Sequence, residues 1–155
     1  MFIDEAYSLV GESKDDFGKE AVATLIKRME DERDKLVVII AGYTDEMNLF
    51  IETNPGFKSR FNRYIEFADY TPIDLLEMFN IQCKKLDYIL SAEARLKIRE
   101  VLQNAYNNKD KTFGNGRFVR NIFEKTLEKQ ANRIASVTSL TKEILITITI
   151  DDIPS

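Results

Sequence analysis

The first part of the chain alternates between helical and strand-like spacings of apolar residues. From Phe17 to Asp34 apolar residues recur at three- and four-residue steps, which predicts an amphipathic helix. The run KLVVIIAGY that follows (35–43) is almost continuously apolar and rich in β-branched residues, as in a strand buried on both faces. A helix followed by such a strand is typical of a parallel α/β sheet, so this fold class is predicted for residues 1–69.

Three shorter segments complete this predicted α/β part. FID, at residues 2–4, is too short for a periodicity, and we assign it as a strand because of the acidic pair that ends it. TDEMNLFIET (44–53) predicts a short helix with Thr44 as its N-cap. Residues 64–68 alternate between two faces, Tyr64, Glu66 and Ala68 against Ile65 and Phe67, which predicts a third strand near a sheet edge.

After Pro72 the pattern becomes helical. Three helices are predicted, over residues 71–86, 91–106 and 117–136, and the first two begin at Thr71 and Ser91. The tail, from residue 142 onward, alternates Ile and Thr, which favours a strand. We therefore expect an all-helical subdomain over 70–136 and a β-like tail over 137–155.

Composition narrows the chemistry that the chain can perform. The 155 residues carry a net charge of −4, which gives no general reason to expect nucleic acid or an anionic membrane as a partner. The absence of histidine excludes His-based catalysis and the common His metal sites. A single cysteine, Cys83, excludes an intrachain disulfide and suits a reducing compartment. No apolar run reaches the length of a membrane span, and we expect the protein in the cytoplasm.

Two adjacent carboxylates, Asp4 and Glu5, end the first apolar segment. Metal-assisted phosphoryl chemistry needs one carboxylate to organise Mg²⁺, usually through water, and another to activate the attacking water. Neighbouring residues at the end of a strand can serve both tasks. The alternative is an ordinary turn from a strand into a loop.

Three arginines lie in glycine-containing motifs. Arg60 and Arg63 belong to NPGFKSRFNR, where they could form surface salt bridges or reach a phosphate on another subunit. Arg117, in FGNGRFVRN, falls in the first turn of a predicted helix. Because the helix dipole disfavours a cation there, we expect a bound anion or a nearby acid to compensate.

The order of these motifs resembles the second half of an AAA+ ATPase module, and more narrowly the group containing the rubisco activase CbbX and stage V sporulation protein K. The resemblance is carried by FIDEAYSL, DDFGKEA, LVVIIAGYTDEM, NPGFKSRF and GNGRFVRN, which together span residues 2 to about 135. It implies a partial parallel P-loop-NTPase-type sheet with flanking helices, followed by a helical lid.

The resemblance also implies roles for the acidic pair and for the end of the second strand. FIDE matches Walker B, so Asp4 would hold Mg²⁺ through water and Glu5 would polarise the water that attacks ATP. The strand ending in AGYT matches sensor 1, where either Tyr43 or Thr44 would contact the γ-phosphate. The loop GESKDDFG (11–18) lies where the family has its second pore-facing loop.

The arginines receive family roles in the same way. SRF matches the arginine-finger motif, so Arg60 would reach the nucleotide of the neighbouring subunit, with Arg63 as the lesser candidate. The Gly-Arg of GNGRF matches sensor 2, which gives Arg117 to the γ-phosphate of its own subunit. The family works as a ring, expected to be a hexamer, that remodels a protein; the sequence does not identify that protein.

The sequence departs from the family in one respect, because no G-x-x-x-x-G-K-[ST] motif occurs in it. We therefore expect the chain to be a fragment of a longer ATPase that binds ATP and Mg²⁺ when complete. The alternative is a non-hydrolysing oligomerisation or partner-binding module with vestigial ATPase motifs. In either case residues 144–150 could pair with another chain, or fill a gap in the sheet of the first part.

Overall fold

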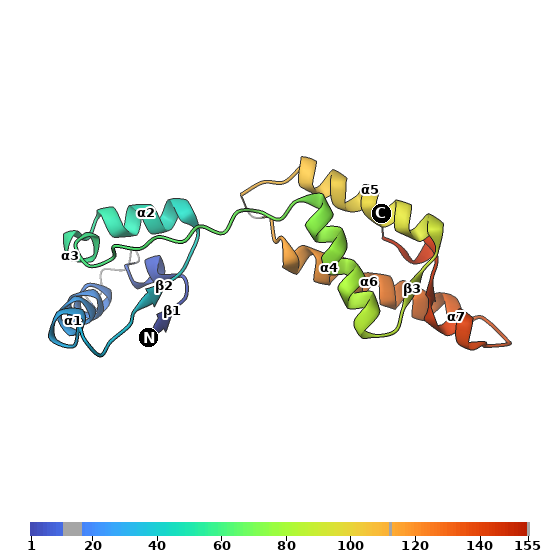
Figure 1. Ribbon diagram of the computed structural model, residues 1–155, viewed down its shortest axis with the longest axis horizontal. Coiled ribbons are helices and arrows are strands. Elements are labelled where there is room, and N and C mark those ends of the chain that lie inside the picture. Colours follow the sequence, from blue (N-terminus) through green and yellow to red (C-terminus); the bar gives the residue numbers. More distant parts are fainter. Residues whose placement is uncertain (11–16, 112, 155) are drawn as a thin grey trace. The chain divides into compact units, whose positions relative to one another are not determined.

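The computed structural model describes residues 1–10, 17–111 and 113–154. Its contacts divide the chain into two units, Met1–Phe67 and Ala68–Ser155. Figure 1 shows the helices and strands of both units. The predicted pore-facing loop falls mostly on residues 11–16, which lie outside the described residues.

The first unit contains a parallel strand pair and helices, as the fold class predicts. Its elements are β1 (Phe2–Ile3), the 3-10 helix η1 (Ala6–Leu9), α1 (Phe17–Asp31), β2 (Ile39–Ile40), α2 (Thr44–Glu52) and α3 (Pro55–Lys58). β1 and β2 pair in parallel, with Phe2 opposite Ile39 and Ile3 opposite Ile40.

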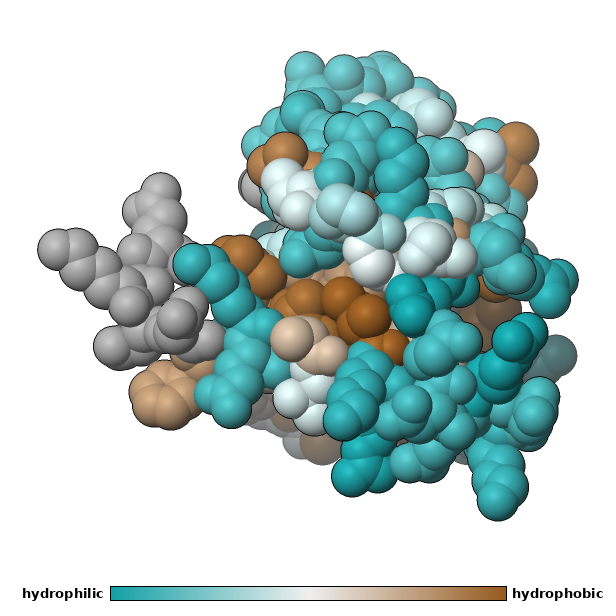
Figure 2. Space-filling view, turned by 90° about the vertical axis from the view of Figure 1, so that its left-hand side faces the viewer, coloured by the Kyte–Doolittle hydropathy of each residue, from teal (hydrophilic) through white to brown (hydrophobic). Residues whose placement is uncertain are grey.

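Phe57, completely buried, lies at the centre of the core of this unit. Its ring packs against those of Phe50 and Phe61, at centroid distances of 5.3 and 5.4 Å. The helix that carries it approaches α1 closely, because a Cβ built on Gly56 would lie 2.8 Å from the Ile26 side chain. Figure 2 shows the side of the molecule with α1 and α3, where hydrophobic side chains lie in a hollow between hydrophilic ones.

Two strand predictions for this unit are wrong, one in its length and the other altogether. Residues 35–43 form a ladder over Ile39–Ile40 alone, and Val37 and Ile39 are 71% and 55% exposed rather than buried on both faces. Residues 64–68 form no strand, and the exposed fractions of Ile65 and Phe67 are 70% and 89%. An apolar or alternating run becomes a strand only where a neighbouring strand pairs with its backbone. Among the described residues of this unit, β1 pairs with β2, and residues 64–68 have no such partner.

The start of α2 also differs from the prediction. Thr44 is the first helical residue, and Tyr43 occupies the N-cap position in an extended conformation without a side-chain cap bond. The carbonyl of Tyr43 accepts the first intrahelical hydrogen bond, from the Met47 N–H, at 2.8 Å. Thr44 is therefore not the N-cap.

The second unit is mainly helical. Its elements are α4 (Pro72–Lys85), β3 (Ile89–Leu90), α5 (Ala92–Asn107), α6 (Gly116–Ala135), α7 (Lys142–Ile146), β4 (Thr147–Ile148) and the 3-10 helix η2 (Ile150–Asp152). The predicted N-caps are confirmed: Thr71 forms a capping box with Asp74, and the Ser91 hydroxyl accepts the Ala94 N–H. In the described part of the chain, every helix is too short or too polar to cross a membrane.

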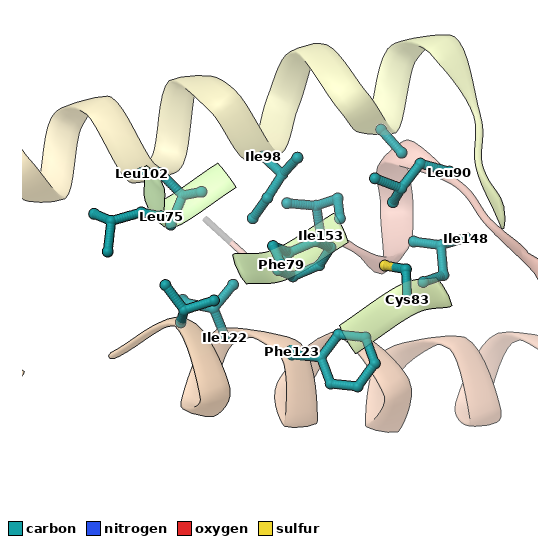
Figure 3. Close-up of a cluster of buried hydrophobic side chains, with 12 residues drawn as sticks. Leu75, Phe79, Cys83, Leu90, Ile98, Leu102, Ile122, Phe123, Ile148 and Ile153 are labelled. Atoms are coloured by element: carbon teal, nitrogen blue, oxygen red, sulfur yellow. The ribbon is translucent and has the colours of Figure 1, made fainter. Parts of the chain in front are cut away.

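Side chains from α4, α5, α6 and the tail form the core of this unit (Figure 3). Phe79 of α4 meets Phe123 of α6 edge to face, with ring centroids 5.4 Å apart. The buried members are Leu75, Phe79, Cys83, Leu90, Ala94, Ile98, Leu102, Val119, Ile122, Phe123, Ile148 and Ile153.

The prediction of a strand over residues 144–150 is wrong for most of its length. Lys142–Ile146 is helical, and Thr147–Ile148 alone is a strand, which pairs in parallel with β3. Ile148 and Ile153 are buried in the core at 0% and 3% exposure. The tail therefore completes the second unit instead of filling the sheet of the first, and the helical subdomain contains a small parallel sheet.

Candidate functional site

The parallel pairing of β1 and β2 brings two predicted motifs to one sheet edge. The Ala41 N–H donates to the Ile3 carbonyl at 2.9 Å, and one step further the Ala6 N–H donates to the Ala41 carbonyl at 3.1 Å. Because the strands run in the same direction, the residues that follow them meet at the carboxyl edge of the sheet. Asp4 and Glu5 therefore lie beside the segment that leads to Tyr43 and Thr44.

Both carboxylates at this edge are exposed. One Asp4 carboxylate oxygen, Oδ1, accepts the Glu5 N–H at 3.1 Å. Glu5 has a left-handed backbone, with φ 47° and ψ 46°, which is uncommon for a residue other than glycine. This conformation turns the chain from β1 into η1, and strained residues of this kind concentrate at functional sites.

The edge also contains a tyrosine that the sequence analysis missed. A Cβ built on Gly42 would lie 2.6 Å from Cε1 of Tyr7, so the Tyr7 ring packs directly on the Gly42 backbone. Partial burial of the Tyr7 hydroxyl, followed by the nearby charges of Glu5 and Glu46, raises its pKa. The sequence signal was the glycine of AGYT, because a strand-end glycine permits such close approach.

The carboxylates at this edge have the ligand chemistry that Mg²⁺ prefers. Asp4 Oδ2 has no hydrogen-bond donor among residues 1–10, 17–111 and 113–154, so it is available to water bound to a metal. Those residues contain no group of three or more acidic, Cys or His side chains that could hold a metal by themselves. Asp4 by itself would supply one carboxylate, so the remaining ligands of a metal at this edge would have to come from water and a bound nucleotide.

Arg60 is held by contacts within the first unit. Its Nη2 donates to Glu30 Oε2 at 2.8 Å, and its Nη1 donates to the Gly56 carbonyl and to Ser59 Oγ at 3.2 and 3.3 Å. The surface-salt-bridge alternative is thus realised for Arg60. Arg63 is exposed and has no ion-pair partner in the part of the chain that the structure describes.

Arg117 lies in the first turn of α6, as predicted, and is exposed. No acid among the described residues forms an ion pair with it, so a nearby acid, one of the two expected compensations for the helix dipole, is not found there. The other, a bound anion, stays a prediction.

Asn115, two residues before Arg117, fixes the start of α6. Its backbone has φ 46° and ψ −115°, and its side-chain amide donates to Asp69 Oδ1 at 2.7 Å and accepts the Tyr70 N–H at 3.0 Å. Asp69 also pairs with Lys109 at 2.6 Å. The hydrogen bond from Asn115, followed by that from Lys109, holds the pKa of Asp69 below its usual range. The GNGR motif is thus tied to the first residues of its own unit.

A cavity of about 760 Å³ opens in the second unit. It is lined by Asn80, Cys83, Lys84, Asp87, Tyr88, Ile89, Leu90, Arg95, Lys142 and Ile146. None of the predicted site residues is among them.

Comparison with known proteins assigns the two parts of the chain. Residues 1–69 match the ATPase family associated with various cellular activities (AAA), and residues 71–155 match the AAA lid domain. Stage V sporulation protein K of Bacillus subtilis (strain 168) is 42% identical over 154 residues, which are 99% of this chain and 48% of that protein. Protein CfxQ of Xanthobacter flavus is 41% identical over 135 residues, 86% of this chain and 42% of CfxQ.

A further relative is the chloroplastic ribulose bisphosphate carboxylase/oxygenase activase of Cyanidioschyzon merolae (strain NIES-3377 / 10D), 39% identical over 156 residues. These cover 99% of this chain and 53% of the activase, so the chain spans about half the length of the curated relatives it matches. The resemblance expected from the motifs is confirmed, and so is the α/β fold with a helical lid. The chain belongs to the AAA family, with an AAA match over residues 1–69 and an AAA lid domain over residues 71–155.

Proposed function

We propose that the chain is the part of a ring-forming AAA+ ATPase that activates water and senses the γ-phosphate, and that this ATPase couples hydrolysis to the remodelling of a protein. The observation that carries the proposal is the shared carboxyl edge of β1 and β2. There, the Asp4–Glu5 pair and the Tyr43–Thr44 pair follow strands joined by the Ala41-to-Ile3 hydrogen bond of 2.9 Å.

At this edge each carboxylate has a separate task. Asp4 would hold Mg²⁺ through water, and the ion would neutralise charge on the β- and γ-phosphates. Glu5 would polarise the attacking water as a general base. Tyr43 or Thr44 would donate a hydrogen bond to the γ-phosphate, and both have a hydroxyl that can do so.

The arginines complete the site in a ring, which we propose to be a hexamer. Arg117 would contact the γ-phosphate of its own subunit, and its exposure without an acidic partner in the described part of the chain suits that role. Arg60 would stabilise transition-state charge in the neighbouring subunit, with Arg63 as the second candidate.

The names of relatives support a protein as the remodelled substrate. One relative is named an activase of ribulose bisphosphate carboxylase/oxygenase, which is itself an enzyme. Others are named for sporulation and for a secretion system. We propose a protein substrate on this basis, without assigning which protein.

Calorimetric titration of Mg-ATP tests the proposal at the level of binding. The 155-residue chain should give no saturable heat, because its sequence lacks the glycine-rich cradle and lysine that bind the phosphates. A chimera that joins the preceding half of stage V sporulation protein K to this chain should bind Mg-ATP. Saturable binding by the chain alone would show that the site does not need the absent motif.

Turnover by the same chimera tests the catalytic assignment. Glu5→Gln should leave Mg-ATP binding unchanged and lower kcat by about 100-fold or more, because the amide cannot accept the proton of the attacking water. Glu52→Gln, at the end of α2, is a matched exposed control that should keep the parent kcat. Equal rates for the two variants would refute the role of Glu5.

A second candidate is a non-hydrolysing association module. The specific observation in its favour is the exposure of apolar side chains around the strand pair, with Phe2 at 63% and Val37 at 71%. Light scattering of the 155-residue chain tests it, because this candidate requires self-association without nucleotide. A monomer at high concentration would leave the ATPase proposal as the better account.

A further inference from the structure

The guanidinium of Arg60 is held from two directions. Its Nη1 contacts are local, since Gly56 and Ser59 lie within four residues of Arg60 in the chain. The Nη2 contact is not local, because Glu30 lies thirty residues away, at the C-terminal end of α1. The hydrogen bond to Glu30 therefore joins the Arg60 guanidinium to a separate element of the first unit, α1.

Packing around Arg60 and Glu30 restricts where the two side chains can lie. The Arg60 side chain is 26% exposed, whereas that of Glu30 is 58% exposed. Close approach of Gly56 to Ile26 keeps α3 against α1, one turn of helix before Glu30. The Nε atom of Arg60 is buried without a hydrogen-bond partner in the described part of the chain.

A held guanidinium is useful for binding an anion. A solvent-exposed arginine loses side-chain freedom when it meets a phosphate, whereas one already fixed by its neighbours loses less. Arg63, three residues later, is exposed and lacks such contacts among the described residues. Of the two arginines of SRFNR, Arg60 is therefore oriented by contacts within the fold, whereas Arg63 is not.

We propose that Glu30 is a positioning residue for Arg60, which directs the guanidinium toward the nucleotide of a neighbouring subunit. The inference rests on the proposed function, in which Arg60 acts between subunits. Glu30 does not touch nucleotide in this scheme. It acts through the ion pair with Arg60, and loss of its carboxylate leaves the Nη2 side of the guanidinium without its fixed partner.

The first experiment measures the pair in the 155-residue chain. Thermal unfolding of Glu30→Ala, Arg60→Ala and the double variant forms a double-mutant cycle. The double variant should lower Tm by less than the two single variants together, because each single change already breaks the same contact. Additive Tm shifts would show that the pair does not form and would overturn the inference.

The second experiment measures turnover in the chimera with stage V sporulation protein K. Glu30→Ala should lower kcat about tenfold with KM for ATP unchanged, because the substitution misplaces the arginine without altering the nucleotide pocket of the same subunit. Glu32→Ala is the matched control, since Glu32 lies one residue beyond the end of α1 and pairs with Arg28 at 2.9 Å instead. An unchanged or higher kcat for Glu30→Ala would contradict a positioning role.

Mixed subunits distinguish failure of this inference from failure of the proposed function. Glu5→Gln subunits keep Arg60 and Glu30, whereas Glu30→Ala subunits keep Glu5. In a mixed ring, a Glu30→Ala subunit beside a Glu5→Gln subunit receives a correctly placed Arg60, so turnover at its site should be restored. Rescue of Arg60→Ala without rescue of Glu30→Ala would overturn the positioning role alone. No effect of Arg60→Ala on turnover would overturn the proposed role of Arg60 itself.

Discussion

Two residues in left-handed backbone conformations belong to the motifs that the family resemblance rests on. Glu5 follows β1 with φ 47°, and Asn115 precedes α6 with φ 46°. Neither is glycine, and a positive φ is uncommon for other residues. The Asn115 side chain forms hydrogen bonds to Asp69 and Tyr70.

Cys83 provides a prediction at the same scale. Its thiol is 4% exposed, and burial raises its pKa to about 11. Because the thiolate is the reactive form, iodoacetamide at pH 8 should modify the folded chain at least about 100-fold more slowly than the chain in urea. Intact mass spectrometry over time measures both rates. Similar rates would show that the thiol is accessible and ionised in the folded state.

At the scale of elements, buried polar contacts hold the tail in the second unit. Arg133 of α6 binds both carboxylate oxygens of Asp152 at 2.8 Å, and the Asp152 side chain is 1% exposed. The Thr149 N–H and hydroxyl donate to the same carboxylate. Gln130 donates to the carbonyls of Leu145 and Thr147 at 3.0 and 3.2 Å. These contacts fix a tail in which the strand found among the described residues, β4, is two residues long.

Asp152→Asn should lower the free energy of unfolding of this unit by about 3 kcal/mol at pH 7, because it leaves Arg133 without its charge partner. Asp151→Asn is the matched control, since Asp151 is exposed. Chemical denaturation followed by circular dichroism measures both variants. Equal losses would show that the ion pair does not hold the tail.

The same pair predicts a pH dependence. Burial by itself would raise the pKa of Asp152, but the bonds from Arg133 and Thr149 outweigh burial and hold the pKa below its usual range. A carboxyl with a lowered folded-state pKa contributes stability above its unfolded pKa of about 3.9, and this contribution is lost as the pH falls through the folded pKa. The difference between the parent chain and Asp152→Asn should therefore shrink below about pH 4.

At the scale of the whole molecule, the two units have separate hydrophobic cores of different size. Among the described residues, twelve buried residues form the core of Ala68–Ser155, whereas six form that of Met1–Phe67. The smaller unit also exposes Phe2 and Ile39 of its strand pair at 63% and 55%. Fewer buried apolar contacts give a lower free energy of local opening.

Hydrogen exchange tests this difference in the intact chain. Amides of α4, α5 and α6 should exchange more slowly than those of α1, β2 and α2, because their core is larger. Peptide-level mass spectrometry resolves the two sets. Equal protection throughout would indicate one cooperative unit and would contradict the division into two.

The sequence by itself determined most helices and the family. The spacing of apolar residues predicted α1, α4, α5 and α6, and the caps at Thr71 and Ser91 were correct because capping is a local interaction between residues three positions apart. The motifs predicted the AAA family, which the family comparisons confirmed. The pairing of β1 with β2, which places the acidic pair beside the AGYT segment, came from the structure.

Tertiary structure decided the strands and the contacts of the site. A strand needs a partner distant in sequence, so the patterns at 64–68 and 144–150 could not show that one would form no strand and the other would pair with β3 over two residues. The contact of Tyr7 with Gly42, and of Arg60 with Glu30, likewise joins residues far apart in the chain. Periodicity describes which side of an element is apolar, whereas packing decides which other element that side meets.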